Sequence, residues 1–344
     1  MSVTNVVMSA PEAAMRVAQE RQAKPVLEAK GLRVEFPVLG GGTTAVIADF
    51  DLALAEGEIF GLVGESGAGK TVLARSLLAL PPEPGRIAGG NLLFSGEDIL
   101  TASPARVQQL RGRLMTLIAS NPRGVLNPLK TVGEQISRVA RIHLGLDAKA
   151  ARAATLDMLR AVQIPDPERR YQAYAHELSG GMAQRVVIAI ALICSPRFVV
   201  ADDATSGLDV TVQTQVLDLL QRLSRERGSS LLFITRDMGI TAHYCDRVAV
   251  MHCGEIMEAA PRDSFFLQPR HPYTIFLMAA FSHNQRLRAG WSRVSAAASR
   301  AVPSKGCGYA ARCPRATDLC LAVRPPLADF GNGHVARCHH PVSR

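Results

Sequence analysis

The segment GESGAGKT combines small residues, one lysine and one hydroxyl at a spacing that suits phosphate binding. Its members are Gly64, Glu65, Ser66, Gly67, Ala68, Gly69, Lys70 and Thr71. Glycines let successive backbone N–H groups turn toward a phosphate, and a following helix adds the positive end of its dipole. Lys70 is expected to reach the β- and γ-phosphates, and the Thr71 hydroxyl to bind Mg²⁺. The segment therefore predicts a site for a nucleotide and magnesium.

Two adjacent acids, Asp202 and Asp203, follow the apolar run FVVA. Beside a phosphate loop, an acid that ends a buried strand commonly holds Mg²⁺ through a water molecule, and we assign this role to Asp202. A second acid usually positions the attacking water. Asp203 stands at that place, but its side chain is one methylene shorter than the glutamate expected there.

Another small-residue segment, LSGGMAQR, begins at Leu178 and precedes a helical pattern. Ser179, Gly180 and Gly181 would lie at the entry of that helix, where backbone N–H groups can bind an anion. Alone this is a weak signal. It gains weight because it stands between the phosphate loop and the acid pair in the sequence.

Strands and helices alternate around these residues. IFGLV (59–63) precedes the phosphate loop, and TVLARSLLAL (71–80) follows it with helical spacing. RFVVADD (197–203) and SSLLFITRD (229–237) predict strands, with a helix at 210–228 between them. This order predicts an α/β core with a parallel sheet, which binds ligands at the carboxyl ends of its strands.

Shorter patterns fill the rest of the chain. Glycine-punctuated strands before the phosphate loop predict a hairpin at Gly40–Gly42. Residues 148–159 and 181–193 predict helices. After about Phe266 the composition shifts toward Pro, Arg and Cys, which indicates a small C-terminal extension.

Composition narrows the function classes. The net charge of +9 is compatible with binding to a nucleic acid, an anionic membrane surface or a nucleotide. Only 5% of the residues are aromatic, which argues against nucleic-acid binding by base stacking. The longest apolar run, residues 186–194, falls short of the ~18–20 residues that span a bilayer. Residues 1–24 lack the features of a secretory signal and predict a flexible tail, so we expect a cytoplasmic protein.

Taken together, the three motifs resemble those of the nucleotide-binding subunits of ATP-binding cassette (ABC) transporters. In that family two subunits sandwich two ATP molecules, each between the phosphate loop of one subunit and the LSGG residues of the other. The segments NPLKTVGEQI, QIPDPERR, GLDVTVQTQVLDLL and RHPYT, and the cysteine-bearing tail, resemble the branch that imports oligopeptides, dipeptides and nickel. The resemblance runs from about Val26 to His340.

This resemblance implies an organisation and a set of partners. A cassette of residues 25–265 would combine a parallel-sheet core, an antiparallel β subdomain and a helical subdomain at about 115–185, and residues 266–344 would form the extension. The partners would be a second ATPase subunit, two transmembrane permease subunits and, indirectly, an external substrate-binding protein, with no nucleic acid. The chain would then lie at the cytoplasmic face of the inner membrane as a peripheral subunit.

Three positions around the γ-phosphate depart from the family. Where the family has a glutamine, a catalytic glutamate and a switch histidine, this chain has Ser120, Asp203 and Arg236. Shortening Glu to Asp withdraws the carboxylate by about 1.5 Å, and such a displacement can cost about 100-fold in rate. Ser120 is too short to replace glutamine. Arg236 cannot exchange a proton near neutral pH, although it can hold a phosphate.

We therefore expect this chain to bind ATP at its own site but to hydrolyse it poorly. The intact LSGG segment implies a heterodimer, in which Ser179, Gly180 and Gly181 complete a competent site on a different subunit. A homodimer with two slow sites is the alternative. Phe36 matches the family's adenine-stacking aromatic residue, and the other interpretation places it in the core.

Four of the seven cysteines lie close together in the sequence of the tail: Cys307, Cys313, Cys320 and Cys338. Without a C-x-x-C pair, the spacing argues against an ordinary zinc ribbon. Some members of the resembled branch carry a [4Fe–4S] cluster in this extension, and we expect one here, with zinc or free thiols as alternatives. We expect His334, His339 and His340 to lie at the surface or around the cluster rather than to bind it.

Competing functions remain open at this point. The chain could be a homodimeric importer ATPase for nickel or another solute, or a cassette ATPase that acts away from membranes on DNA or ribosomes. No tandem second cassette and no long coiled coil accompany the motifs, which favours the importer. A redox protein built on the cysteines would leave the phosphate loop unexplained.

Overall fold

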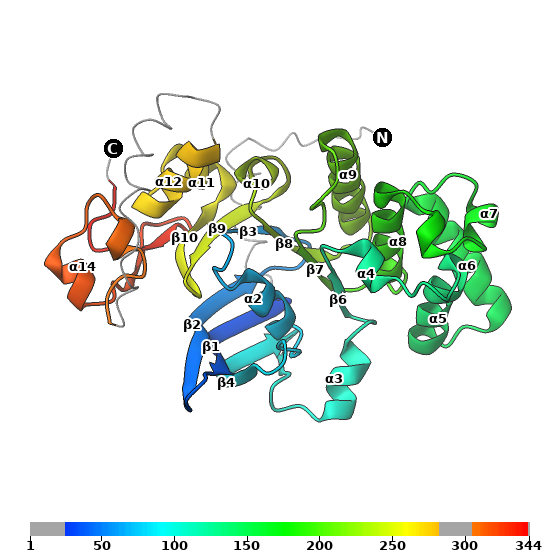
Figure 1. Ribbon diagram of the computed structural model, residues 1–344, viewed down its shortest axis with the longest axis horizontal. Coiled ribbons are helices and arrows are strands. Elements are labelled where there is room, and N and C mark those ends of the chain that lie inside the picture. Colours follow the sequence, from blue (N-terminus) through cyan, green and yellow to red (C-terminus); the bar gives the residue numbers. More distant parts are fainter. Residues whose placement is uncertain (1–24, 282–304, 343–344) are drawn as a thin grey trace, which may run out of the picture.

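The computed structural model describes residues 25–281 and 305–342 (Figure 1). The tail predicted over residues 1–24 lies outside the described residues, as do residues 282–304 and 343–344 of the predicted extension.

The larger of two sheets has the strand order β11-β12-β10-β9-β3-β8-β7-β6. Its strands are β3 (Ile59–Val63), β6 (Met115–Ile118), β7 (Phe198–Asp202), β8 (Ser230–Thr235), β9 (Arg247–His252), β10 (Glu255–Pro261), β11 (Leu327–Asp329) and β12 (Val335–Arg337). Strands β9, β3, β8, β7 and β6 are parallel. Every residue of β3, β7 and β8 is buried, as expected for parallel strands that are covered on both faces. The predicted parallel sheet is confirmed.

The smaller sheet is antiparallel, with the order β2-β1-β4-β5. It consists of β1 (Leu27–Pro37), β2 (Thr43–Leu54), β4 (Arg86–Phe94) and β5 (Glu97–Asp98). The β1–β2 hairpin turns at Gly40, Gly41 and Gly42, which all have positive φ. Helix α2 (Lys70–Ser76) lies next to this sheet, below the larger one in Figure 1.

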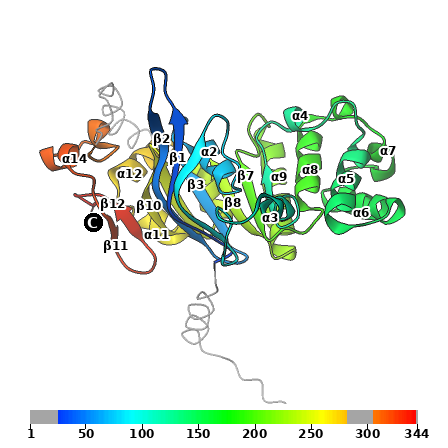
Figure 2. The same ribbon diagram turned by 90° about the horizontal axis from the view of Figure 1, so that it is seen from below.

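A group of helices forms the end of the molecule beyond β6 (Figures 1 and 2). It contains α4 (Pro122–Val125), α5 (Val132–Leu144), α6 (Ala148–Ala161), α7 (Pro167–Tyr171) and α8 (Gly180–Leu192). Helix α5 begins with a capping box, in which Thr131 and Glu134 exchange side-chain and backbone hydrogen bonds. Helices α6 and α8 confirm the helices predicted at 148–159 and 181–193. As predicted, the fold contains a helical part in addition to the two sheets.

Further helices connect and cover the strands. They are α3 (Pro104–Leu110), α9 (Val210–Glu226), α10 (Met238–Tyr244), α11 (Arg262–Leu267), α12 (Pro272–Phe281) and α14 (Asp318–Ala322), with the 3-10 turns η1 (Ala175–Glu177) and η2 (Ala310–Arg312). Helix α9 joins β7 to β8, as the strand–helix–strand pattern predicts.

The C-terminal segment continues the larger sheet. Strand β12 pairs antiparallel with β10, and β11 pairs with β12. Helix α14 and these two strands form the opposite end of the molecule from α5–α8 (Figures 1 and 2). The cassette and its extension therefore share one sheet.

A buried carboxylate lies at the junction of cassette and extension. Glu258 on β10 is fully buried, and it accepts hydrogen bonds from the backbone N–H groups of Arg270 (2.7 Å) and His271 (2.8 Å). The Nε2 atom of His334 lies 2.7 Å from Oε1, the same oxygen that accepts the Arg270 hydrogen bond. His334 is only 4% exposed, so the expectation that it lies at the surface is wrong. Its burial follows from the pairing of β12 with β10, which the local sequence does not reveal.

Candidate functional site

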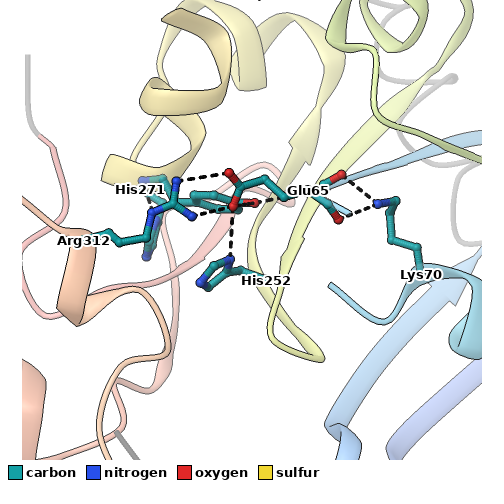
Figure 3. Close-up of polar contacts among 7 residues, drawn as sticks. Glu65, Lys70, His252, His271 and Arg312 are labelled. Atoms are coloured by element: carbon teal, nitrogen blue, oxygen red, sulfur yellow. Dashed lines mark hydrogen bonds and ion pairs between the residues drawn. The ribbon is translucent and has the colours of Figure 1, made fainter. Parts of the chain in front are cut away.

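The phosphate loop joins β3 to α2 at the carboxyl end of the parallel strands. Gly69 precedes the helix with φ +97°, a conformation that glycine adopts readily. Gly64 lies so close to the Met251 carbonyl that a Cβ would stand 2.4 Å from its oxygen. The Nζ of Lys70 donates to the carbonyl oxygens of Gly64 (2.7 Å) and Glu65 (2.8 Å), as Figure 3 shows. The loop therefore folds around its own lysine.

Asp202 ends β7 beside the start of α2. It is 8% exposed, and burial raises the pKa of its carboxyl, while a hydrogen bond with the Thr71 side chain opposes that shift. Burial likewise lowers the pKa of Lys70, against the opposing charges of Asp202 and Asp203. The structure thus brings together the lysine, the hydroxyl and the first acid that the motifs single out.

The three residues that depart from the resembled family lie at the same edge of the sheet. Asp203 follows β7 with φ +49°, and its Oδ2 accepts a hydrogen bond from Nη2 of Arg236 at 3.3 Å. Ser120 follows β6 and is exposed; Ile118 on that strand pairs with Ala201 on β7, so Ser120 and Asp203 leave neighbouring strands at the same end. Two of the three departures, Asp203 and Arg236, thus form an ion pair.

Ser179 caps α8, and its Oγ accepts a hydrogen bond from the Met182 N–H (3.3 Å). Ser179, Gly180 and Gly181 line a cavity of about 460 Å³ together with Gln163 and Arg185. A Cβ on Gly181 would stand 2.6 Å from Val212, whereas one on Gly180 would make only an ordinary contact with Leu208. Helices α2 and α8 lie apart in both views (Figures 1 and 2). The two glycine motifs of one chain do not share a site.

Phe36 lies at the end of β1 and is partly buried. Its ring packs on Gly85, where a Cβ would come within 2.5 Å of the ring. The expectation that the Phe36 ring stacks on adenine remains a prediction.

The four tail cysteines gather around one small cavity, which His271, Tyr309, Arg315, His339 and His340 also line. Burial raises the pKa of Cys307 and of Cys338 to about 11. Among residues 25–281 and 305–342, no group of three or more His, Cys, Asp or Glu side chains is arranged to hold a metal ion. The thiols are neighbours, but they are not in a ligand geometry.

A polar cluster that the motifs do not reveal surrounds the side chain of Glu65. Its carboxylate accepts two hydrogen bonds from Arg312, at 2.7 and 3.1 Å, and one from the Tyr273 hydroxyl at 3.3 Å. The Nδ1 of His252 lies 4.0 Å from the same carboxylate (Figure 3). Burial alone would raise the pKa of Glu65, but the hydrogen bond and charge of Arg312 bring it below its ordinary value. Tyr273, Arg312 and His252 lie far from the loop in sequence, so no local signal identifies them.

Comparisons with known proteins agree with this geometry. A family model described as "ABC transporter" matches residues 47–206, and one described as "Oligopeptide/dipeptide transporter, C-terminal region" matches residues 257–320. The oligopeptide transport ATP-binding protein OppD of Salmonella typhimurium is 39% identical, over 97% of this chain and 99% of the relative. The dipeptide transport ATP-binding protein DppD of Bacillus subtilis is 38% identical, over 91% and 94%.

Solved structures support the fold. The dimeric bacterial ABC transporter cassette MJ0796 superposes with a TM-score of 0.61 at 21% identity, over 69% of this chain and 98% of that one. The structure of cbiO1 of Clostridium perfringens, part of the ABC transporter complex cbiONQ, gives the same TM-score of 0.61 at 21% identity, over 78% of this chain and 99% of that one. The chain belongs to the ABC transporter family, as an ATPase that carries the oligopeptide/dipeptide transporter C-terminal region. The predicted resemblance, fold and ATPase class are thereby confirmed. Among the described residues, no helix is long and apolar enough to cross a membrane.

Proposed function

We propose that this chain is the ATP-binding subunit of a membrane importer for dipeptides or oligopeptides. The observation that carries the proposal is the near full-length similarity to OppD and DppD, which includes the C-terminal region. Its partners would be a second ATPase subunit and two permease subunits, served by an external substrate-binding protein. The chain would work at the cytoplasmic face of the inner membrane.

Within this proposal, the phosphate loop Gly64–Thr71 binds ATP. Lys70 leaves the Gly64 and Glu65 carbonyls and turns to the β- and γ-phosphates, while the backbone N–H groups of the loop hold the phosphate oxygens. The oxygens of Thr71 and Asp202 already lie together, and hard oxygen donors suit Mg²⁺. Magnesium would neutralise the phosphate charge. Phe36 would stack on the adenine.

The chain's own site is proposed to be a poor catalyst. The short carboxylate of Asp203 is engaged by the guanidinium of Arg236 rather than free to position water. The guanidinium of Arg236 offers only hydrogen-bond donors, so it cannot act as histidine does. Ser120 offers only a hydroxyl near the strand end. The Asp203–Arg236 contact and the side-chain types of Arg236 and Ser120 support an ATP-binding site with little hydrolysis.

The surface around Ser179 is proposed to serve the partner subunit. Ser179, Gly180 and Gly181 line a cavity away from the chain's own phosphate loop, and small residues there allow a phosphate to approach the helix entry. A heterodimer would then contain one competent site, built from the partner's phosphate loop and these residues. The alternatives are a homodimer, nickel or another solute as cargo, and a cassette ATPase that acts away from a membrane.

Co-purification tests the assembly. The tagged chain, extracted in mild detergent from its native cell, should bring down a different ATPase and two membrane proteins. Recovery of the chain paired only with itself would refute the heterodimer. Uptake by a deletion strain then tests the cargo: loss of peptide uptake with normal nickel uptake is expected, and the reverse result would assign nickel.

We also propose that the cysteine cavity holds a [4Fe–4S] cluster with a structural role. The support is chemical, since Cys307, Cys313, Cys320 and Cys338 line one cavity and four thiolates suit such a cluster. These side chains would have to move into ligand geometry when the cluster binds. Protein purified without oxygen should be brown and hold about four iron atoms per chain, and Cys320→Ser should remove both. Colourless protein with stoichiometric zinc would refute the proposal.

A further inference from the structure

Glu65 is held from two sides, and only one of them belongs to the nucleotide site. Its carbonyl oxygen accepts a hydrogen bond from Lys70 at 2.8 Å, inside the phosphate loop. Its carboxylate points the other way, into the C-terminal segment, where it meets Arg312 (Figure 3). A single residue of the loop therefore links the phosphate-binding lysine to residues more than two hundred positions away.

Two parallel hydrogen bonds fix the geometry of the contact between Arg312 and Glu65. Nη1 of Arg312 lies 2.7 Å from Oε2 of Glu65 and Nη2 lies 3.1 Å from Oε1, which is the two-bond fork that guanidinium and carboxylate form. The guanidinium also lies 5.0 Å from the ring centre of Phe276 and 5.8 Å from that of Tyr309. These rings and the fork define both the position and the orientation of the Glu65 side chain.

The Tyr273 hydroxyl contacts both the backbone N–H and the carboxylate of Glu65. The hydroxyl of this fully buried tyrosine accepts a hydrogen bond from the Glu65 N–H and donates one to the Glu65 carboxylate, both at 3.3 Å. The main chain of the loop, which must present its N–H groups to phosphate, is thus held by α12, while η2 holds the Glu65 side chain.

Arg312 in turn stands inside the cysteine segment. It ends η2, between Cys307 and Cys313, and the turn is closed by hydrogen bonds from Ala310 N–H to Cys307 and from Cys313 N–H to Ala310. The Cys307 N–H donates to the Cys320 carbonyl at 2.8 Å. Any change in the path of this segment moves the Arg312 fork.

From these contacts we infer that Arg312 is a positioning residue for the phosphate loop, and that the Glu65–Arg312 pair couples ATP binding to the cysteine segment. This inference rests on the proposed ATP binding and adds a route by which the extension controls it. When Arg312 is lost, the Glu65 carboxylate loses its charged partner on a loop that must receive a triphosphate, and the loop keeps only its Tyr273 anchor. Because coupling between two sites is reciprocal, bound ATP must also stabilise the cysteine segment.

Equilibrium binding of a fluorescent ATP analogue to the full chain tests the inference. Arg312→Gln should raise the Kd roughly 5- to 50-fold. The matched control is Arg324→Gln, because Arg324 also anchors the extension, to Asp49 and to Glu255, but its ion pairs include no residue of the phosphate loop. Both variants should lower Tm, whereas the control should leave Kd within about twofold. Equal changes in Kd for the two variants would overturn the inference.

A double variant tests the pair itself. Glu65→Gln combined with Arg312→Gln should bind ATP at least as well as Arg312→Gln alone, because the carboxylate without its charged partner is gone; multiplied losses would argue against a direct pair. Hydrogen exchange of residues 305–320 in the unmodified chain gives a readout that needs no variant. ATP should slow exchange there, and unchanged exchange would overturn the coupling. If the unmodified chain bound no ATP, the proposed function would fail instead, so the two failures are distinguishable.

Discussion

The phosphate-loop site and the surface around Ser179 use their polar groups differently. At the loop, Lys70 donates to two carbonyls of the loop itself and Arg236 donates to Asp203. Around Ser179, the residues line a cavity of about 460 Å³ at a helix entry. The departures from the family fall at the first region, while the LSGG residues of the second are intact. Under the proposed function, this contrast reflects two tasks: the loop holds nucleotide, and the Ser179 surface completes catalysis in another subunit.

The largest effect is expected from Gly180→Asp. It places an anion and extra bulk against the phosphate held by the partner, and like charges at an interface repel by several kcal/mol. ATPase activity of the reconstituted complex should fall at least about 100-fold. Gly180→Ala is the matched control, because a Cβ there meets only Leu208 at 3.4 Å. Full ATPase activity of Gly180→Asp would show that the surface around Ser179 does not complete a catalytic site in the partner subunit.

Lys70→Ala tests the first region directly. It removes the cation expected to face the β- and γ-phosphates, and the loss of charged hydrogen bonds should weaken ATP binding by the chain alone roughly 10- to 100-fold. The measurement is a titration with labelled ATP. Binding equal to that of the unmodified chain would show that Gly64–Thr71 does not hold the phosphates.

A restored site should gain activity. Ser120→Gln, Asp203→Glu and Arg236→His together should raise the slow ATPase rate of the chain by about 10-fold. Each substitution alone should leave the rate unchanged, because groups that act as a unit do not contribute separately. A large gain from Asp203→Glu alone would locate the whole defect at one carboxylate.

The smallest effect is expected from Asp203→Asn. If Asp203 belongs to a site with little hydrolysis, the ATPase rate and uptake of the assembled complex should stay within about twofold of the unmodified values. The same steady-state assay used for Gly180→Asp measures it. Should Asp203→Asn abolish activity as completely as Gly180→Asp, Asp203 would be a working catalytic base and the contrast between the two regions would disappear.

Local patterns were enough to predict much of the fold and part of the site. The loop around Lys70, the acid at the end of β7 and the cap at Ser179 each depend on residues within one strand–turn–helix unit, so a short window of sequence specifies them. The continuous apolar runs of β3, β7 and β8 likewise identify buried parallel strands.

The missed features are contacts between distant segments. Glu65 and Arg312 are separated by 247 positions, and each looks like an ordinary polar residue in its own window. His334 is buried because Glu258 lies next to it after β12 has joined the sheet, although its neighbours Gly331 and Gly333 indicate an exposed turn. Such burial depends on chain topology, which composition and periodicity do not encode.

The pairing of β12 with β10 also bears on how the chain is made. Glu258 pairs with Ala336, so during synthesis one edge of β10 stays unpaired until residues 335–337 have left the ribosome. That edge belongs to a strand whose Ile256, Met257, Ala259 and Ala260 are buried in the finished protein. An unpaired apolar strand is a template for association between chains. The C-terminal segment therefore covers this edge only once the chain is complete, and a chain that stops short of β12 keeps the edge exposed from the moment of its release.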